Sequence, residues 1–570
     1  MNAAAEYKRW LGKTEGTAYY DELKKMEPFT QEIEESFARE LSFGTAGMRG
    51  ILGLGTFRMN RFTVGRATQG LADYINEVFG GGEVAISYDS RIQSEEFARE
   101  TAAILAANGI KAHIYSRLMP VPLLSFATRY LNCKAGVMIT ASHNPAIYNG
   151  YKVYGSDGCQ MTDVDADAVL ARINKRDYFD FKTVDFEEAR SQGKIEFIPK
   201  KVVEAYYTSV SKCRVNPYAP MKKGIRIAYT PLNGAGNEPV RRVLEMCGHK
   251  KVFVVKEQEK PDGNFPTCPY PNPETEKARN LGIKLAKLKK CDLLIATDPD
   301  SDRVGVVFKD GKPGKYRSIT GNEAGVLMLD YIIRCRKQNG TLPERAVAVR
   351  SIVSSSLADE ICRDNGVEMR QVLTGFKYIG EQILLLEQAG EADRFIFGFE
   401  ESCGYLSSTD VRDKDGVYAA MLLAEMTSYY KSIGTTPLQV LDGIYAKYGY
   451  YRNRVANIQF PGVDGPEKMT AVMEKLRENM PSEIAGIKVA ETDDILKGEH
   501  RNADGSITKI NLPASNVLSF HMENGAKVIV RPSGTEPKMK LYITAKEASI
   551  AASDKLAKEL EDAVKAYAGL

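Results

Sequence analysis

Short apolar runs alternate with longer amphipathic stretches between about residue 60 and residue 450. The apolar runs predict strands at residues 84–89, 135–140, 225–230, 251–255, 292–297 and 394–400. Strands that are nearly continuous apolar runs and are separated by helical stretches are typical of α/β layers whose sheets are covered on both faces. Each run ends in a polar or glycine-rich turn, which is where open α/β sheets bind ligands.

Residues 451–570 follow a different pattern. Two strand-like runs, residues 517–522 and 526–530, flank Glu523-Asn524-Gly525, which predicts a hairpin. A third run covers residues 540–545. After it, Leu556, Leu560, Val564 and Tyr567 fall on one face of a predicted helix. This region therefore reads as a smaller α+β domain.

Composition narrows the class of protein. The chain has 570 residues, of which 43% are hydrophobic and 26% charged, with a net charge of +3. This length predicts about three to five domains, and the charge balance favours no nucleic acid or membrane partner. We expect no signal peptide and no membrane span. Nine scattered cysteines indicate reduced thiols in the cytoplasm, and five isolated histidines make a zinc site unlikely.

The sequence TASHNP, residues 140–145, directly follows a predicted strand. A serine in such a turn, Ser142, is a candidate nucleophile, although a turn that only satisfies its own backbone is the alternative. The GxSxG frame of an esterase is missing, so acyl transfer fits poorly. Lys152 follows in the same region. It is either a solvated surface cation or a group that moves a proton near a reacting hydroxyl.

A second constellation, DPDSDR at residues 298–303, lies between two apolar runs. Asp298, Asp300 and Asp302 would repel one another unless a cation lay among them, and carboxylate oxygens suit Mg²⁺. A calcium EF-hand is excluded because Arg303 and Lys309 occupy the positions that need glycine and glutamate. A solvated acidic turn is the alternative, but the flanking apolar runs favour a metal site.

Four further loops carry polar groups. RPSGTEP at residues 531–537 combines an arginine, hydroxyls and a glycine, which suits a phosphate dianion. GFEESCGY at residues 398–405 suits sugar hydroxyls, FGTAGMRG at residues 43–50 offers amides and an arginine, and TGFK at residues 374–377 is a basic loop. Each is weak alone. No Walker A loop and no GxGxxG follows a strand, so nucleotide binding has no support.

Together and in this order, from residue 43 to residue 542, these motifs resemble the α-D-phosphohexomutase superfamily, and most of all its phosphoglucomutase branch, whose sugar loop reads GFEES. The resemblance implies four domains around a central cleft. Three would be α/β domains of similar mixed-sheet topology and the last an α+β domain. We expect the four domains to span residues 1–212, 213–318, 319–450 and 451–570. In that order they would carry the phosphoserine loop, the metal loop, the sugar-recognition loop and the phosphate-binding loop.

The resemblance also implies an activity and its residues. It is the interconversion of glucose 1-phosphate and glucose 6-phosphate through a phosphoserine, with Mg²⁺ and glucose 1,6-bisphosphate as cofactors. The implied catalytic residues are Ser142, His143 and Lys152. The implied metal ligands are Asp298, Asp300, Asp302 and the phosphate on Ser142. The implied substrate contacts are Arg49, Arg303, Thr374, Gly375, Glu400, Ser402 and Lys414. The implied phosphate contacts are Arg531, Ser533, Gly534 and Thr535.

Two departures leave the sugar and the second acid/base group open. Cys403-Gly404-Tyr405 replaces the histidine-containing end of the phosphomannomutase-type sugar loop, and Asn233 stands where relatives often have histidine. Phosphomannomutase, phosphopentomutase and hexose bisphosphate synthase activities are therefore alternatives. A metal-dependent phosphatase is less favoured because such enzymes generally use histidine ligands, and a non-catalytic sugar-phosphate-binding protein would not need the acidic trio. We expect a monomer or dimer that acts on small sugar phosphates.

Overall fold

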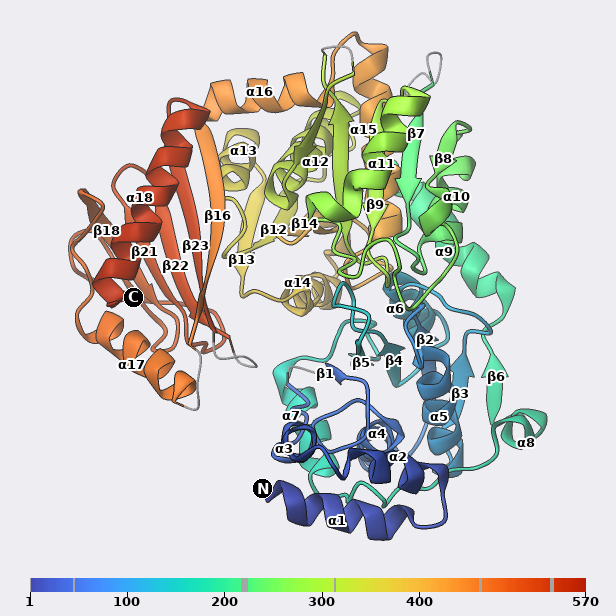
Figure 1. The fold of residues 1–570 in the computed structure, drawn as a ribbon. Coiled ribbons are helices and arrows are strands. Elements are labelled where there is room, and N and C mark those ends of the chain that lie inside the picture. Colours follow the sequence, from blue (N-terminus) through green and yellow to red (C-terminus); the bar gives the residue numbers. More distant parts are fainter. Residues whose placement is uncertain are drawn as a thin grey trace.

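The computed structural model describes residues 2–44, 47–216, 224–311, 314–460, 464–533 and 538–569. Four sheets follow one another along the chain, and the C-terminal sheet stands beside the three α/β layers (Figure 1). The predicted architecture of three α/β domains and a different C-terminal domain is confirmed. The limits given above for each domain stay a prediction.

Three N-terminal helices precede the region that the hydrophobic pattern covered. They are α1 (Ala3–Thr14), α2 (Ala18–Met26) and α3 (Thr30–Phe37). Their apolar faces enclose Trp10, which is fully buried and contacts the rings of Phe37 and Phe62 edge-on. The amide of Phe57 donates to the carbonyl of Ser36 and ties this layer to the segment before α4 (Arg61–Phe79). The helices thus extend the first domain.

The first sheet has six strands in the order β1-β5-β4-β2-β3-β6. Its strands are β1 (Gly47–Ile51), β2 (Glu83–Tyr88), β3 (Lys111–Ile114), β4 (Ala135–Ile139), β5 (Tyr148–Gly155) and β6 (Ile195–Phe197). Strands β2, β3, β4 and β6 are parallel, whereas β1 and β5 are antiparallel to their neighbours. The accompanying helices are α5 (Ser94–Ala107), α6 (Val121–Tyr130), α7 (Asp163–Ile173), α8 (Phe186–Ser191) and α9 (Lys200–Lys212).

The second sheet has the order β11-β10-β9-β7-β8. It consists of β7 (Ile227–Thr230), β8 (Val252–Val254), β9 (Leu293–Thr297), β10 (Val304–Lys309) and β11 (Tyr316–Ile319), with α10 (Asn237–Met246), the short η2 (Lys256–Gln258) and α11 (Glu276–Lys289). Strands β7, β8 and β9 lie within the ranges predicted for them. Their parallel pairing explains why each is apolar on both faces.

The third sheet has the order β13-β12-β14-β15. Its strands are β12 (Val347–Ser351), β13 (Glu368–Val372), β14 (Phe395–Glu400) and β15 (Gly404–Leu406). Its helices are α12 (Gly321–Gln338), α13 (Leu357–Asn365), α14 (Phe376–Gln388), η3 (Ala392–Arg394), α15 (Gly416–Ser432) and α16 (Pro437–Tyr448). The predicted strand at 394–400 is β14, and the sugar loop turns between it and β15.

The C-terminal sheet contains the predicted hairpin. Its strands are β16 (Tyr450–Gln459), β17 (Glu483–Ile484), β18 (Ile487–Asp494), β19 (Glu499–Arg501), β20 (Ile507–Lys509), β21 (Leu518–Met522), β22 (Lys527–Pro532) and β23 (Lys538–Glu547), with α17 (Gly465–Glu478) and α18 (Ile550–Ala568). Leu556, Leu560 and Val564 of α18 are buried, as predicted. Tyr567, on the same predicted face, is 38% exposed, and its hydroxyl donates to the carbonyl of Asn479.

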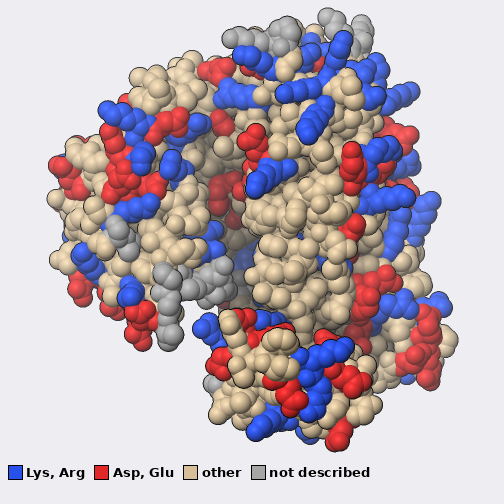
Figure 2. Space-filling view, in the orientation of Figure 1, with Lys and Arg blue, Asp and Glu red and all other residues tan. Residues whose placement is uncertain are grey.

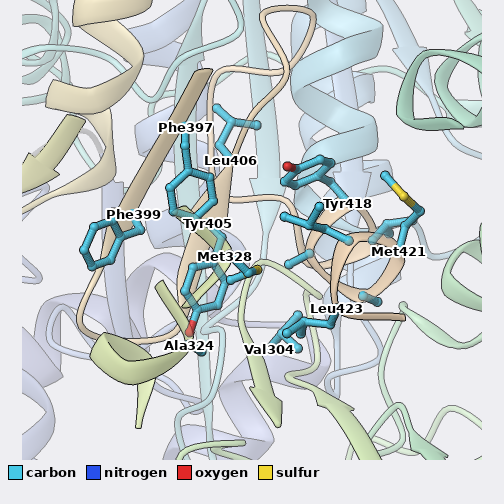
Figure 3. Close-up of a cluster of buried hydrophobic side chains, with 14 of the residues drawn as sticks. Val304, Ala324, Met328, Phe397, Phe399, Tyr405, Leu406, Tyr418, Met421 and Leu423 are labelled. Carbon is cyan, nitrogen blue, oxygen red and sulfur yellow. The ribbon is translucent and has the colours of Figure 1, made fainter. Parts of the chain in front are cut away.

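The apolar cores divide the molecule unequally. One continuous core joins side chains from the first three domains. Figure 3 shows part of it, a cluster that includes Val304 of β10, Phe397 of β14 and Tyr418 of α15. The C-terminal sheet and α18 have a core of their own. A smaller cluster, which includes Ile352 and Ile529, joins the third domain to the C-terminal domain. Among the described helices, none combines the length and apolarity needed to cross a membrane.

Candidate active site

Ser142 lies in the turn between β4 and β5, close to the carboxyl end of β4. Its φ of +51° places it in the left-handed region, which is costly for a residue other than glycine. Its amide donates to Thr140 Oγ1 at 2.8 Å, and its side chain is buried. Its Oγ donates to Asp298 Oδ2 at 2.7 Å. The turn therefore aims the serine hydroxyl at the acidic loop.

The acidic loop connects β9 to β10, and Asp298, Asp300 and Asp302 are all buried. One oxygen from each lies within 4.8 Å of the others. Burial, and next the charges of Asp300 and Asp302, raises the pKa of Asp298 well above its ordinary value. Within the described ranges, the buried Asp300 Oδ1 and Asp302 Oδ1 accept no hydrogen bond. Three converging carboxylates with unsatisfied oxygens fit a hard divalent cation.

Two lysines supply positive charge beside this trio. Lys152 of β5 donates to Asp300 Oδ2 at 2.9 Å and lies 3.7 Å from Asp302. Lys414 Nζ lies 3.2 Å from Asp302 Oδ2 and donates to Asp413 Oδ1 at 2.9 Å. Elements of the first three domains thus meet at one cluster.

His143 and Arg49 flank the serine turn. His143 Nδ1 lies 3.2 Å from Ser142 Oγ, and the imidazole meets the ring of Tyr270 edge-on. Burial, followed by the charges of Arg303 and Arg49, holds the pKa of His143 well below its ordinary value, so the ring is neutral. Arg49 of β1 donates to Asn144 Oδ1 at 2.9 Å. Both residues therefore lie beside Ser142.

The sugar loop begins where β14 ends at Glu400. The amide of Gly375 donates to Glu400 Oε1 at 2.7 Å, so the loop that carries Thr374 lies against it. The buried Thr374 Oγ1 has no hydrogen-bond partner among the residues described. The amide of Val304 donates to the carbonyl of Cys403 at 3.0 Å, which joins the sugar loop to the metal loop beside Arg303. Ser402 lies in the same turn.

The phosphate-binding candidates lie on the C-terminal domain, at the end of β22. Arg531 and Ser533 border a cavity of about 360 Å³, and the amide of Ser533 donates to the carbonyl of Lys538 at 2.8 Å, which draws the two ends of the loop together. Gly534 and Thr535 lie outside the described residues. Figure 2 shows a hollow between the C-terminal domain and the rest of the molecule, with acidic and basic side chains inside it.

One member of a candidate loop does not serve the cluster. Lys377, the basic residue of TGFK, is buried and its Nζ donates to Asp163 at the start of α7, so it binds the third domain to the first. The sequence reading also missed Glu274, which pairs with Arg303 at 3.4 Å, and Arg91, which bonds the serine turn. A signal for Arg91 was present, because polar residues follow directly after the strand at 84–89.

Known protein families match the chain over most of its length. Residues 40–179, 204–311 and 320–448 match the alpha/beta/alpha domains I, II and III of phosphoglucomutase/phosphomannomutase, in that order. Residues 469–564 match the C-terminal domain of the same family. The four matches follow the order of the four sheets.

Individual proteins agree with this assignment. A phosphoglucomutase of Staphylococcus aureus (strain USA300) is 38% identical over 517 residues, which are 90% of this chain and 91% of the relative. The structure of parafusin from Paramecium, 19% identical, matches with a TM-score of 0.69 over 93% of this chain and 97% of its own. A phosphoglucomutase/phosphomannomutase family protein of Burkholderia thailandensis, 19% identical, matches with a TM-score of 0.66 over 92% and 97%. The chain therefore belongs to the phosphoglucomutase/phosphomannomutase family of the α-D-phosphohexomutase superfamily and is an isomerase.

Proposed function

We propose that this chain is a phosphoglucomutase that interconverts glucose 1-phosphate and glucose 6-phosphate by way of a phosphoryl group carried on Ser142. The observation that carries the proposal is the 2.7 Å hydrogen bond from Ser142 Oγ to Asp298 within the buried acidic trio. A hydroxyl held against a cation site is what a reversible phosphoryl carrier needs. The phosphoglucomutase relatives support the choice of glucose.

The proposed reaction exchanges two oxygen–phosphorus bonds in turn. The phosphoryl group on Ser142 Oγ passes to the 6-hydroxyl of glucose 1-phosphate, which gives glucose 1,6-bisphosphate and frees the serine oxygen. The phosphoryl group at position 1 then passes to Ser142 Oγ and leaves glucose 6-phosphate. The proton that the sugar hydroxyl gives up passes to the neutral ring of His143, or to Lys152 after that lysine has released a proton of its own; both groups lie beside the serine turn.

The chain's own residues hold charge and position around this transfer. Asp298, Asp300 and Asp302 would hold Mg²⁺, which when bound neutralises charge on the moving phosphoryl group. Lys152, Lys414 and Arg303 place positive charge beside the same carboxylates. The proposed contacts to the sugar and to the substrate as a whole are Arg49, Arg303, Thr374, Gly375, Glu400, Ser402 and Lys414.

The C-terminal loop is proposed to grip the phosphate that is not being transferred, through Arg531, Ser533, Gly534 and Thr535. The bisphosphate must turn over between the two half-reactions, since each of its phosphates faces Ser142 once. A grip on a domain with its own core suits this, because it can release one phosphate and bind the other while the first three domains keep their shape.

Mass analysis of the Ser142 peptide tests the proposal. The purified protein, incubated with glucose 1,6-bisphosphate and Mg²⁺, is expected to gain one phosphoryl group on that peptide and to lose it on addition of glucose 1-phosphate or glucose 6-phosphate. The Ser142→Ala variant should gain none and should lose at least about 1,000-fold in mutase turnover. A Ser142→Ala enzyme with near-normal turnover would overturn the phosphoserine pathway.

The sugar is the second part of the test. A panel of glucose, mannose and pentose 1-phosphates, with a catalytic trace of hexose bisphosphate, should give the highest kcat/KM for glucose. Preference for mannose or pentose would assign the corresponding mutase activity, and net accumulation of bisphosphate would assign a synthase. Phosphate release that exceeds isomer formation would assign a phosphatase. We further propose that the protein acts in the cytoplasm, since all nine cysteines are free thiols. A monomer or dimer is proposed for its oligomeric state.

A further inference from the structure

Arg91 follows β2 and is buried beneath the serine turn. Its Nη1 donates to the carbonyls of Pro145 and Tyr148 at 3.0 and 2.9 Å. Its Nη2 donates to the carbonyls of Ser142 and Asn144. One guanidinium thus bonds four backbone oxygens of a single turn, a number that no other protein cation can reach in one plane.

The other side of the Ser142 backbone is held by Asp89, the residue that follows β2. Asp89 Oδ2 accepts from Thr140 Oγ1 at 2.7 Å, and Thr140 Oγ1 in turn accepts from the Ser142 amide at 2.8 Å. Asp89 Oδ2 also lies 3.3 Å from Arg91 Nε. The amide and the carbonyl of Ser142 are therefore both fixed from the end of one strand, which offsets the cost of its positive φ.

A loop of the second domain covers Arg91 from the far side. The Phe265 ring lies 5.1 Å from the guanidinium carbon, a distance at which a cation–π contact stabilises the buried charge. Gly263 packs directly on the backbone beside Arg91, because a Cβ there would lie 2.5 Å from the amide nitrogen of Ile92. The same loop continues to Tyr270, against His143, and to Glu274, against Arg303.

We propose that Arg91 is a positioning residue for phosphoryl transfer: it fixes the strained backbone of Ser142 so that Oγ faces the acidic trio, and Phe265 of the second domain completes its site. Among the described residues Arg91 forms no hydrogen bond or ion pair with Asp298, Asp300 or Asp302, although it feels the charges of Asp300 and Asp298, and it belongs to none of the substrate-binding loops. Its effect is therefore expected on the transfer step rather than on substrate affinity. The inference rests on the proposed role of Ser142 as the phosphoryl carrier.

The test compares Arg91→Lys with Arg99→Lys. Arg99 lies on α5, is partly exposed and pairs with Glu187, so it serves as the matched control. Lysine keeps the charge of Arg91 but cannot bond four carbonyls. We expect the rate of Ser142 phosphorylation by glucose 1,6-bisphosphate, and kcat, to fall about 100-fold in Arg91→Lys. The KM for glucose 1-phosphate should stay within about twofold, because binding residues are unchanged.

Phe265→Leu is the second variant, in case Arg91→Lys does not fold. It keeps an apolar side chain and should slow the same phosphorylation step about threefold, again with KM and melting temperature near those of the wild type. Wild-type phosphorylation rates in folded Arg91→Lys would overturn the proposal. If Arg91→Lys is unfolded, a wild-type rate in Phe265→Leu would overturn it instead. If the wild-type protein gains no phosphoryl group on Ser142, the proposed function fails first.

Discussion

The reacting centre and the phosphate-gripping loop are built in opposite ways. Ser142, the acidic trio and Lys152 are buried or nearly so, bond one another across domains, and rest on a core that is continuous through the first three domains. Arg531 and Ser533 instead stand at the end of a sheet with a separate core, joined to the third domain by a small apolar cluster. In Figure 1 the C-terminal sheet and α18 stand beside the three α/β layers.

This difference fits the two tasks that we propose. In-line phosphoryl transfer requires reacting atoms to be held within fractions of an ångström, which favours a closely packed, hydrogen-bonded centre. A group that must let go of one phosphate and bind another needs freedom to move as a unit. Four predictions, from the largest effect to the smallest, examine whether the two regions really behave differently.

Loss of one metal-site carboxylate should have the largest effect. Asp302→Asn removes a charge from the trio and should lower kcat about 1,000-fold with little change in melting temperature, because the site then holds Mg²⁺ poorly. Turnover as a function of Mg²⁺ concentration, with EDTA-treated wild type for reference, measures this. Asp442→Asn, at an exposed carboxylate on α16, is the matched control. Unchanged Mg²⁺ dependence in Asp302→Asn would contradict the metal site.

Core truncations should separate the two regions thermodynamically. Leu423→Ala, in the shared core (Figure 3), should cost about 2–5 kcal/mol and destabilise the first three domains together. Ile529→Ala lies in the small interdomain cluster. It should instead make the amide hydrogens of the C-terminal domain exchange, and that domain become protease-sensitive, before the first three domains do. Hydrogen exchange read by mass spectrometry distinguishes the two. Equal and global destabilisation by both variants would show that the molecule unfolds as one unit.

Truncation of the phosphate-binding loop should weaken substrate binding more than it slows phosphoryl transfer. Arg531→Ala removes a charge-assisted contact and should raise the KM for glucose 1-phosphate about 10- to 100-fold. Phosphorylation of Ser142 should still occur at saturating bisphosphate. Arg501→Ala, on the exposed β19 of the same domain, serves as its control. A fall in kcat with KM unchanged would mean that Arg531 acts in the transfer step itself.

A buried lysine between the third and C-terminal domains should give the smallest effect. Lys527 donates to the carbonyl of Ile352 at 2.9 Å. Burial, followed by the charge of Arg350, lowers the pKa of Lys527 to about 7. Between that value and the ordinary lysine pKa of about 10.4 the unfolded chain binds more protons, so stability rises with pH.

The matching variant removes this rise. Melting temperatures of the wild type and of Lys527→Gln should be measured at about pH 7 and at about pH 9. The melting temperature of the wild type, relative to that of the variant, should be a few degrees higher at pH 9 than at pH 7. Lys509→Gln, on the exposed β20, should follow the wild type at both values. Parallel curves for the wild type and Lys527→Gln would mean that Lys527 titrates normally.

Local pattern was sufficient for much of the fold. The apolar strands at 84–89, 135–140 and 292–297 could be recognised from local sequence alone, because strands buried on both faces form nearly continuous apolar runs. The polar residues that follow those strands identified the serine and aspartate loops, because open α/β sheets bind ligands at the carboxyl ends of their strands. Tyr567 shows what the pattern leaves open: helical periodicity puts it on one face with Leu556, Leu560 and Val564, but it does not predict that Tyr567 is partly exposed while the other three are buried.

The sequence by itself determined which chemical groups stand at which strand ends, and hence the family, since these depend on residue type and short spacing. Only the tertiary structure decided which of those groups meet. It assigned Lys377 to Asp163 rather than to the cluster, and it brought Arg91 under Ser142 and Phe265 over Arg91. Such contacts join residues tens to hundreds of positions apart. They are set by how whole sheets pack, which no local pattern encodes.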